Sequence, residues 1–317
     1  MNLVRRRHFL RLLPAAVLCS CGDNGSPPPP KFPKVKWRIT STTPFISDLV
    51  KVIGGDAVDA RSFVPLEGNL HSFMPNAQES AGFHTSDMVI SNGLGLESKW
   101  PVDFDALDKN GVHVFSATAR IPDGRILRPS GPGGPPDPHV WMHPELAVLM
   151  VDAVEAALKE VMPKLAAYFT PRAHKLRLAF QDVMKFVGTK MKELKPDDRF
   201  LLTSHDSMQY FAAAFGLEAR ALAAAGEKVP EALPADIAAW ITEHRVKSLF
   251  RESFTDVIAL RRLLVDLKVD PDHVIYSLTL PAAGTSAMVG FKPYEVFNAA
   301  EAVHYSADTV QSTLEVD

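Results

Sequence analysis

Short apolar runs alternate along most of the chain with segments in which apolar residues recur every three or four positions. In the first half, the short runs span residues 34–40, 58–64, 86–93 and 111–118. The segments with helical periodicity between them span residues 44–55 and 75–83. Because strands that alternate with helices are typical of βαβ units, this half predicts a parallel sheet covered by helices.

The middle of the chain carries a different pattern. Residues 119–136 are rich in proline and glycine, and they predict a surface loop because neither helix nor strand forms well there. The helical pattern that follows has Pro144, Pro163 and Pro171 at positions typical of helix starts. Its last segment, 171–194, would be about 36 Å long at 1.5 Å per residue. A helix of that length is expected to cross a domain boundary.

Strand-like runs and helical segments alternate again in the second half. The runs span residues 199–205, 217–224, 246–253 and 273–280, and the helical segments span 206–216, 234–244, 255–267 and about Glu295 to Leu314. We therefore predict an α/β fold of two Rossmann-like lobes with parallel sheets, joined by a long rigid linker helix. The predicted boundaries are an N-terminal lobe at 34–162, the linker helix at 163–195 and a C-terminal lobe at 196–317.

The first residues of the chain indicate export and anchoring. Residues 1–20 contain four arginines, no acid and an apolar run shorter than the roughly 20 residues of a membrane span, which predicts a signal peptide. A twin-arginine export motif beginning at Arg6 and an ordinary basic n-region are the two explanations for the arginines. The stretch "LCSC" resembles a bacterial lipobox that would place lipid on Cys21, and the Pro-rich residues 21–33 predict an extended tether.

Composition narrows the classes of function. The only other cysteine, Cys19, lies in the predicted signal peptide, so a lipidated mature chain has neither a disulfide nor a cysteine metal site. Removal of residues 1–20 changes the formal charge from −3 to −7, since four arginines and no acids are lost. A mildly acidic protein argues against a nucleic-acid partner. We predict a protein on the periplasmic or cell-surface side that meets the membrane through its lipid.

Three histidines lie in turns near the predicted carboxyl ends of strands. They are His71 in "GNLHSFMPNAQES", His139 in "DPHVWMHPE" and His205 in "LLTSHDSMQYF". In open α/β sheets, loops gather at this edge and bind ligands there. Neutral imidazole suits zinc, and three histidines with one further ligand form a standard four-coordinate site, although a histidine in a loop is more often only a solvated polar residue. From the residues alone, both interpretations stay open.

From about Val35 to Leu314 the chain resembles the zinc/manganese substrate-binding lipoproteins of bacterial ABC importers. The motifs that carry the resemblance are "GNLHSFMPNAQES", "SDMVISNGLGLE", "DPHVWMHPELA", "SHDSMQYFAAAFGL" and "LFRES". The resemblance implies two lobes around a rigid helix, with a metal ion at their interface. It also implies a monomer that captures a divalent transition metal, Zn²⁺ rather than Mn²⁺, and delivers it to an ABC permease without catalysis.

The same resemblance implies a ligand set. His71, His139 and His205 match the family's first three metal ligands, and a histidine at position 205 is the zinc-type choice. The segment "IYSLTLPAAG" places Leu278 where the family usually has an aspartate as fourth ligand. The candidates for the fourth ligand are therefore Glu252, Glu67, Glu295 and a water molecule. In the family, the glutamate that matches Glu252 usually supports the site.

Two other functions remain open from the sequence. Three histidines and an open position also suit a zinc-dependent hydrolase, in which Asp206 or Glu252 would be the general base. The second is an anchored family member that has lost metal binding. Leu278 favours this function because it stands where the family usually has an aspartate ligand. We expect the remaining histidines to be solvated or hydrogen-bonded in ordinary elements, and His143 to lie at the surface or behind the ligands. Those in ordinary elements are His84, His113, His174, His244, His273 and His304.

Overall fold

The computed structural model describes residues 32, 35–65, 68–224, 227–252, 255–274, 286–289 and 292–295. The predicted signal peptide, Cys21 and nearly all of the tether lie outside these residues, as does nearly all of the final helix predicted near residues 295–314. In the part of the chain that is described, no helix combines the length and the hydrophobicity that crossing a membrane requires.

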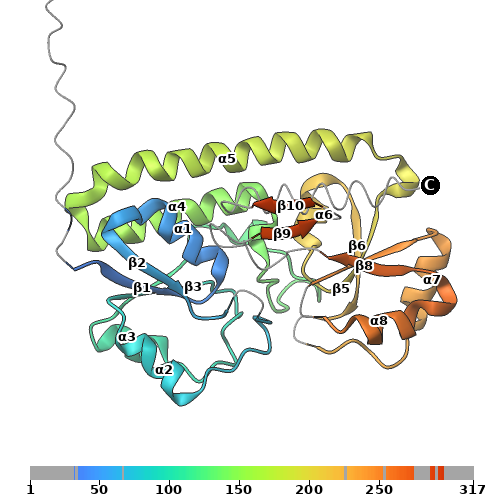
Figure 1. Cartoon of the computed structure of the whole chain (residues 1–317), viewed down its shortest axis with the longest axis horizontal. Helices are drawn as coiled ribbons and strands as arrows, with labels where there is room; N and C mark the ends of the chain where they lie inside the picture. The colour runs from blue at the N-terminus through green and yellow to red at the C-terminus, as the bar shows by residue number, and fades with distance from the viewer. Residues whose placement is uncertain are drawn as a thin grey trace, which may run out of the picture. The chain divides into compact units, whose positions relative to one another are not determined.

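The first sheet consists of four parallel strands in the order β2-β1-β3-β4 (Figure 1). The strands are β1 (Trp37–Ser41), β2 (Val58–Ser62), β3 (Met88–Ser91) and β4 (His113–Ser116). Each strand falls on one of the predicted apolar runs, and the predicted parallel sheet is confirmed. Ile39 and the run from Met88 to Ile90 are buried, as expected for a parallel sheet that is covered on both faces.

Three helices accompany this sheet. They are α1 (Pro44–Gly54), α2 (Ala77–His84) and α3 (Phe104–Lys109). The Thr43 side chain caps α1 by accepting the Ile46 N–H at 3.3 Å, and proline takes the first helical position. The sequence pattern did not predict α3, because six residues are too few to show helical periodicity. Its start is marked instead by Asp103, whose Oδ1 accepts the Ala106 N–H at 2.9 Å.

Two long helices follow, α4 (Pro144–Val161) and α5 (Ala166–Glu193). The 28 residues of α5 give a length of about 42 Å. The helix packs against α1 and α4 at one end and against α6 at the other (Figure 1). The helix α5 therefore contacts helices that accompany each of the two sheets.

The predicted role of Pro171 as a helix start is wrong, because this residue lies inside α5. Proline costs a helix one backbone hydrogen bond. The helix nevertheless begins before it, where the 3₁₀ turn Pro163–Leu165 leads directly into Ala166. Phe169 and Ala173, on either side of the proline, are completely buried, so packing of this first part of α5 outweighs the local preference.

The second sheet repeats the arrangement of the first, with four parallel strands in the order β6-β5-β7-β8. The strands are β5 (Phe200–His205), β6 (Glu218–Ala223), β7 (Ser248–Arg251) and β8 (Asp270–Val274), and the helices between them are α6 (Gln209–Phe215), α7 (Ala235–Glu243) and α8 (Val257–Leu264). The prediction of two α/β lobes with parallel sheets is thereby confirmed. We call the elements before α5 the N-terminal lobe and those after it the C-terminal lobe.

The end of the chain departs from the prediction in two places. Strand β8 begins at Asp270, earlier than the predicted run 273–280. An antiparallel hairpin of β9 (Ser286–Val289) and β10 (Lys292–Glu295) was not predicted, and Glu295 lies in a strand rather than at a helix start. Neither hairpin strand alternates apolar and polar residues cleanly, so the sequence gives no period-two signal there.

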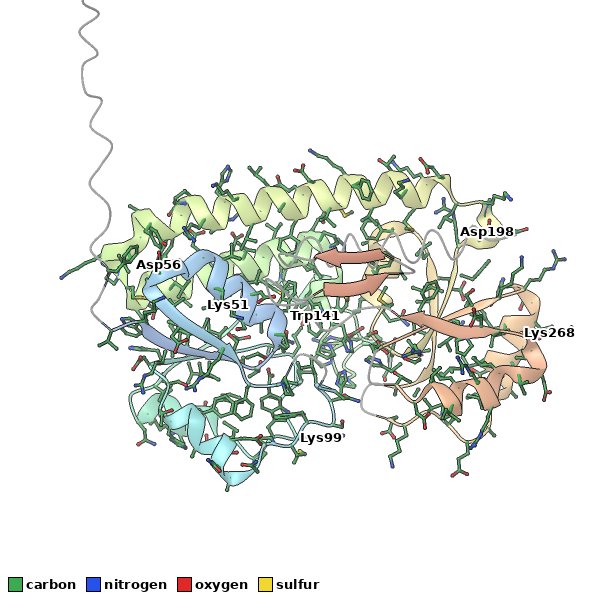
Figure 2. The ribbon with its side chains drawn as sticks, viewed as in Figure 1. Lys51, Asp56, Lys99, Trp141, Asp198 and Lys268 are labelled. Carbon is green, nitrogen blue, oxygen red and sulfur yellow. The ribbon has the colours of Figure 1, made fainter. Side chains whose placement is uncertain are left out.

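One large hydrophobic core runs from the first sheet through α4 and α5 to α6, and it includes Phe250 of β7. A smaller core lies between the second sheet and the helices α7 and α8, and Leu249 belongs to it. Adjacent residues of β7 thus contribute to different cores, because side chains alternate across a strand. Trp141, labelled near the middle of Figure 2, is buried in the large core, whereas Asp198 and Lys268 lie at the edge of that view. The large core fixes α6, and with it the segment after His205, against the N-terminal lobe.

Candidate metal site

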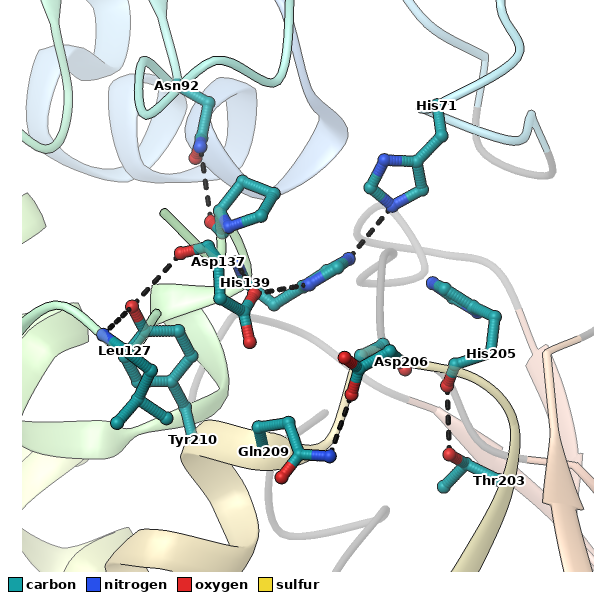
Figure 3. A network of polar contacts seen from close by, with 12 residues as sticks. His71, Asn92, Leu127, Asp137, His139, Thr203, His205, Asp206, Gln209 and Tyr210 are labelled. Atoms are coloured by element: carbon teal, nitrogen blue, oxygen red, sulfur yellow. Dashed lines mark hydrogen bonds and ion pairs between the residues drawn. The ribbon is translucent and has the colours of Figure 1, made fainter. Parts of the chain in front are cut away.

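His71 lies in a turn after β2 that is shaped by an asparagine. The Asn69 Oδ1 accepts the backbone N–H groups of His71 at 3.0 Å and of Ser72 at 3.4 Å, and the backbone oxygen of Asn69 accepts from Phe73 N at 2.9 Å. Asparagine side chains that bond the backbone two residues later form such turns readily. The turn presents the His71 ring toward the other two histidines (Figure 3).

His139 is completely buried at the end of the Pro/Gly-rich loop. One oxygen of Asp137 holds it twice, because Oδ1 accepts the His139 backbone N–H at 2.9 Å and lies 2.7 Å from the ring Nδ1. The ring also packs edge-on against Trp141, with 5.4 Å between centroids. A histidine whose Nδ1–H is donated to a carboxylate keeps Nε2 free of a proton in its neutral form, which is the form that binds a metal.

His205 is the last residue of β5 and is also buried. Its Nδ1 lies 2.8 Å from Oε1 of Glu252, which follows directly after the neighbouring strand β7. The two oxygens of Glu252 also accept the hydroxyls of Ser207 at 2.6 Å and of Ser204 at 2.5 Å. The carboxylate is therefore fixed by three donors and in turn orients the His205 ring.

The structure brings the three predicted histidines together. One ring nitrogen from each lies within 4.8 Å of the other two, and His71 Nε2 is 2.9 Å from His139 Nε2. Two nitrogens bound to one tetrahedral zinc at about 2.0–2.1 Å would be about 3.3 Å apart. The observed spacing brackets this value, so shifts of the order of an ångström in side-chain position would suffice to enclose an ion.

Burial and neighbouring charges set the protonation of these groups. Burial, together with the proximity of His139 and His205, lowers the pKa of His71 to about 2, so its ring is neutral at physiological pH. Burial opposes charge on His205, but the attraction of Glu252 outweighs it and raises the pKa of His205. For Glu252 the cost of burial is likewise outweighed, by His205 and the two serine hydroxyls, and the pKa falls to about 2. A negative carboxylate therefore persists behind His205.

Two further carboxylates lie near the cluster. Asp206 follows His205 and accepts from Gln209 Nε2 at 2.8 Å, and burial raises its pKa (Figure 3). The second oxygen of Asp137, Oδ2, is buried and has no hydrogen-bond partner within the described residues. A buried carboxylate oxygen without a donor is costly, and a cation beside it would reduce that cost. The local electrostatics therefore favour a positive ion.

A cavity of about 390 Å³ opens beside His205. The N-terminal lobe lines it with Asn69 and Ser72, and the C-terminal lobe contributes Ser204, Thr255 and Asp256 among others. The cavity therefore lies against one of the three histidines, His205, and is lined by residues of both lobes.

Of the residues considered for the fourth ligand position, only Glu252 has a side chain that the structure describes. Glu252 contacts Nδ1 of His205 and two serines, and within the described residues the group that could share a metal ion contains only the three histidines. This geometry supports the orienting role of Glu252 and not direct ligation. Leu278 and Glu67 lie outside the described residues, as does the side chain of Glu295.

The other histidines take the ordinary places expected of them where they are described. His143 caps α4, with Nδ1 accepting from Glu145 N at 3.3 Å, and His244 stacks on Phe200 at 3.8 Å between centroids. His84, His113 and His174 are exposed. The side chains of His273 and His304 lie outside the description.

Sequence reasoning missed three residues that shape the site, namely Asp137, Asn92 and Tyr210. Asn92 is buried and donates from Nδ2 to Pro138 O at 3.2 Å, next to His139. The Tyr210 hydroxyl contacts the backbone at Leu127 and Asp137. Asp137 carried a local signal, since an acid two residues before a histidine can reach its ring. The other two contacts connect distant segments and left no local signal.

The chain is similar to known metal-binding proteins over most of its length. The family described as "Zinc-uptake complex component A periplasmic" matches residues 39–289. The manganese-binding lipoprotein MntA of Bacillus subtilis is 28% identical over 240 residues, which are 74% of this chain and 76% of that protein. The zinc-binding protein TroA of Treponema pallidum is 28% identical over 221 residues, or 69% and 70% of the two chains.

A solved structure of the Treponema pallidum periplasmic zinc-binding protein TroA shares the fold. It superposes with a TM-score of 0.76 at 24% identity, covering 88% of this chain and 99% of that one. Fold and histidine cluster together define an α/β protein of two parallel-sheet lobes with a candidate metal site. Since the family match covers well over half of its residues, the chain belongs to the periplasmic zinc-uptake component A family.

Proposed function

We propose that this protein captures a divalent transition metal ion outside the cytoplasm and delivers it to an ABC permease. The observation that carries the proposal is the cluster of three ring nitrogens, two of them on histidines whose other nitrogen faces a buried carboxylate. A carboxylate–histidine pair of this kind is the usual support of a metal-binding histidine. The lipoprotein and metal-binding names of the relatives support the same function.

Zn²⁺ is the cargo that the donor atoms fit best. Three imidazole nitrogens are borderline ligands, which suit zinc, whereas manganese favours more oxygen ligands. Within the described residues the cluster contains no carboxylate. The relatives are named for manganese, zinc and iron, so they support a transition metal without choosing among the three.

The hydrolase alternative receives little support from the geometry. A general base needs an oxygen that can reach a metal-bound water. Both Glu252 oxygens are engaged by His205, Ser204 and Ser207, and Asp206 is held by Gln209. A binding protein that performs no chemistry needs no such base.

Metal content and affinity test the proposal directly. Protein purified without chelator should contain about one zinc per chain, and competition with a chromogenic chelator should give tighter binding for Zn²⁺ than for Mn²⁺. A protein that binds neither ion would favour the family member that has lost metal binding. Tighter binding of Mn²⁺ would show that a carboxylate outside the described residues completes the site.

The membrane anchor is a separate proposal, because residues 1–31 lie outside the described structure. We propose that Cys21 carries lipid and that residues 21–33 tether the metal-binding body. Cys21→Ser protein should then appear in the soluble fraction, while Cys19→Ser protein should remain with the membranes. The reverse result would assign the lipid to Cys19. The names of the relatives support a lipoprotein, but nothing in them supports the twin-arginine route.

A further inference from the structure

Tyr210 is a buried residue of α6 whose hydroxyl contacts the loop that leads to His139 (Figure 3). The hydroxyl donates to Asp137 O at 3.0 Å and accepts the backbone N–H of Leu127 at 2.9 Å. These two residues flank the Pro/Gly-rich residues 128–136, and they pair with each other because Asp137 N donates to Leu127 O at 2.8 Å. One hydroxyl from the C-terminal lobe thus joins both ends of a loop in the N-terminal lobe.

On the side of the C-terminal lobe, Tyr210 is linked closely to His205. Only four residues separate them, and the segment is fixed by several contacts. Asp206 N donates to Ala223 O at 3.1 Å, and Gln209 Nε2 donates to the Asp206 carboxylate at 2.8 Å. The Met208 side chain is buried. A displacement of Tyr210 would therefore move the end of β5, where the His205 ring is attached.

On the side of the N-terminal lobe, Asp137 connects Tyr210 to His139. Its backbone oxygen accepts from the Tyr210 hydroxyl, and its side chain accepts from the backbone and ring of His139. Asn92, directly after β3, donates to the intervening Pro138 carbonyl. One residue, Asp137, therefore connects Tyr210 to the His139 ring. Its backbone oxygen contacts the tyrosine and its carboxylate contacts the ring.

We propose that Tyr210 is a positioning residue that sets the spacing of His139 and His205 and so preorganises the metal site. The inference rests on the proposed function, since spacing matters only if the histidines share an ion. Burial raises the pKa of Tyr210, so the hydroxyl remains available as a donor at any physiological pH. Groups that orient metal ligands from outside the first coordination shell commonly change metal affinity by 10–100-fold.

The substitution Tyr210→Phe removes the hydroxyl and keeps the ring in its buried place. We expect the full chain to bind Zn²⁺ about tenfold more weakly, and the visible absorption spectrum of bound Co²⁺ to change because the angles between ligands change. Tyr168→Phe is the matched control, because the Tyr168 hydroxyl accepts from Asp56 N at 3.4 Å and contacts none of the three histidines. That control should keep the parental affinity and the parental Co²⁺ spectrum.

Each result decides the inference. Parental zinc affinity in Tyr210→Phe overturns it, and so does weaker binding with an unchanged Co²⁺ spectrum, because that would indicate a general loss of stability. If Tyr210→Phe does not fold, hydrogen exchange of the Leu127 amide in the parent chain is the deciding measurement. Zinc should slow that exchange, and an unchanged rate overturns the inference. A parent chain that binds neither Zn²⁺ nor Co²⁺ overturns the proposed function as well.

Discussion

The two lobes support their histidines by the same chemistry but from different distances along the chain. In the N-terminal lobe, the carboxylate on His139 belongs to Asp137, two residues away. In the C-terminal lobe, the carboxylate on His205 belongs to Glu252, 47 residues away and directly after the neighbouring strand β7. Within the described residues, the Asp137 carboxylate accepts from His139 alone, whereas the Glu252 carboxylate accepts from His205, Ser204 and Ser207. A local support can form from a turn alone, but the second requires an assembled sheet.

His71 differs from both. Its turn is fixed through the backbone by Asn69, and within the described residues no carboxylate is bonded to its ring. It is also the least buried of the three histidines. We therefore expect the cluster to contain two oriented ligands and one more adaptable ligand, which makes the contributions of the three experimentally separable.

The largest expected effect is the loss of a ligand. His139→Ala and His205→Ala should each weaken zinc binding by at least about 100-fold, because an oriented ligand and its carboxylate partner are both disconnected. His71→Ala should weaken it less than either. Competition with a chromogenic chelator measures all three, with His244→Ala as the control that should bind like the parent. Equal binding by any of the three variants and the parent would remove that histidine from the site.

Loss of the distant carboxylate should come next. Glu252→Gln should weaken zinc binding by about 10–100-fold, since the amide no longer provides a negative charge behind His205. Isothermal titration at pH 7 measures the change. A loss as large as that of His205→Ala would instead indicate that Glu252 ligates the metal, and no change would show that the negative charge of Glu252 does not support zinc binding.

The pair of His205 and Glu252 also predicts how zinc binding depends on pH. The pKa of His205 is raised above its ordinary value of about 6.5. As the pH falls, protons therefore begin to compete with zinc for His205 at a pH above about 6.5. The pKa of His71 is lowered to about 2, so this residue releases no proton when it binds the ion. Below the pKa of His205, zinc affinity should fall by up to about tenfold per pH unit. In Glu252→Gln the fall should begin at lower pH, and an unshifted profile would contradict the coupling.

A carboxylate added at the usual fourth place should have a moderate effect. Leu278→Asp should tighten zinc binding by about tenfold, or about 1.4 kcal/mol, by adding charge and a fourth bond. It should help Mn²⁺ relatively more, because manganese favours oxygen ligands. Leu278→Asn is the matched control without the charge. Unchanged affinity for both metals in a folded Leu278→Asp protein would mean that position 278 does not face the ion.

The smallest effect is expected from the local carboxylate. Asp137→Asn keeps an oxygen that can accept from both the backbone and the ring of His139, so binding should weaken by only about three- to tenfold. The ratio of this loss to that of Glu252→Gln measures the difference between local and distant support. A larger loss for Asp137→Asn would reverse the comparison and indicate that the second oxygen of Asp137, Oδ2, acts on the metal.

The amino-acid sequence by itself determined the class of fold and the candidate histidines. Alternating apolar runs and helical segments are local signals, and they predicted seven of the eight strands of the two parallel sheets closely, while β8 begins earlier than its predicted run. Turn residues beside His71, His139 and His205 marked the carboxyl ends of strands, where parallel topology gathers loops. Local rules also misled at Pro171, where a preference of a few kcal/mol is smaller than the packing of a buried helix.

Only the tertiary structure decided how the site is supported. Glu252 meets His205 because β5 and β7 are neighbours in the sheet order, and Tyr210 meets Leu127 and Asp137 because α6 belongs to the core of the other lobe. Such contacts depend on sheet order and on the packing of lobes, which are set by the burial of many side chains together. A single position in the sequence carries no record of them. The pattern therefore marked the candidate histidines, and the family resemblance marked Glu252, while the contacts of Asn92 and Tyr210 could be found only in the fold.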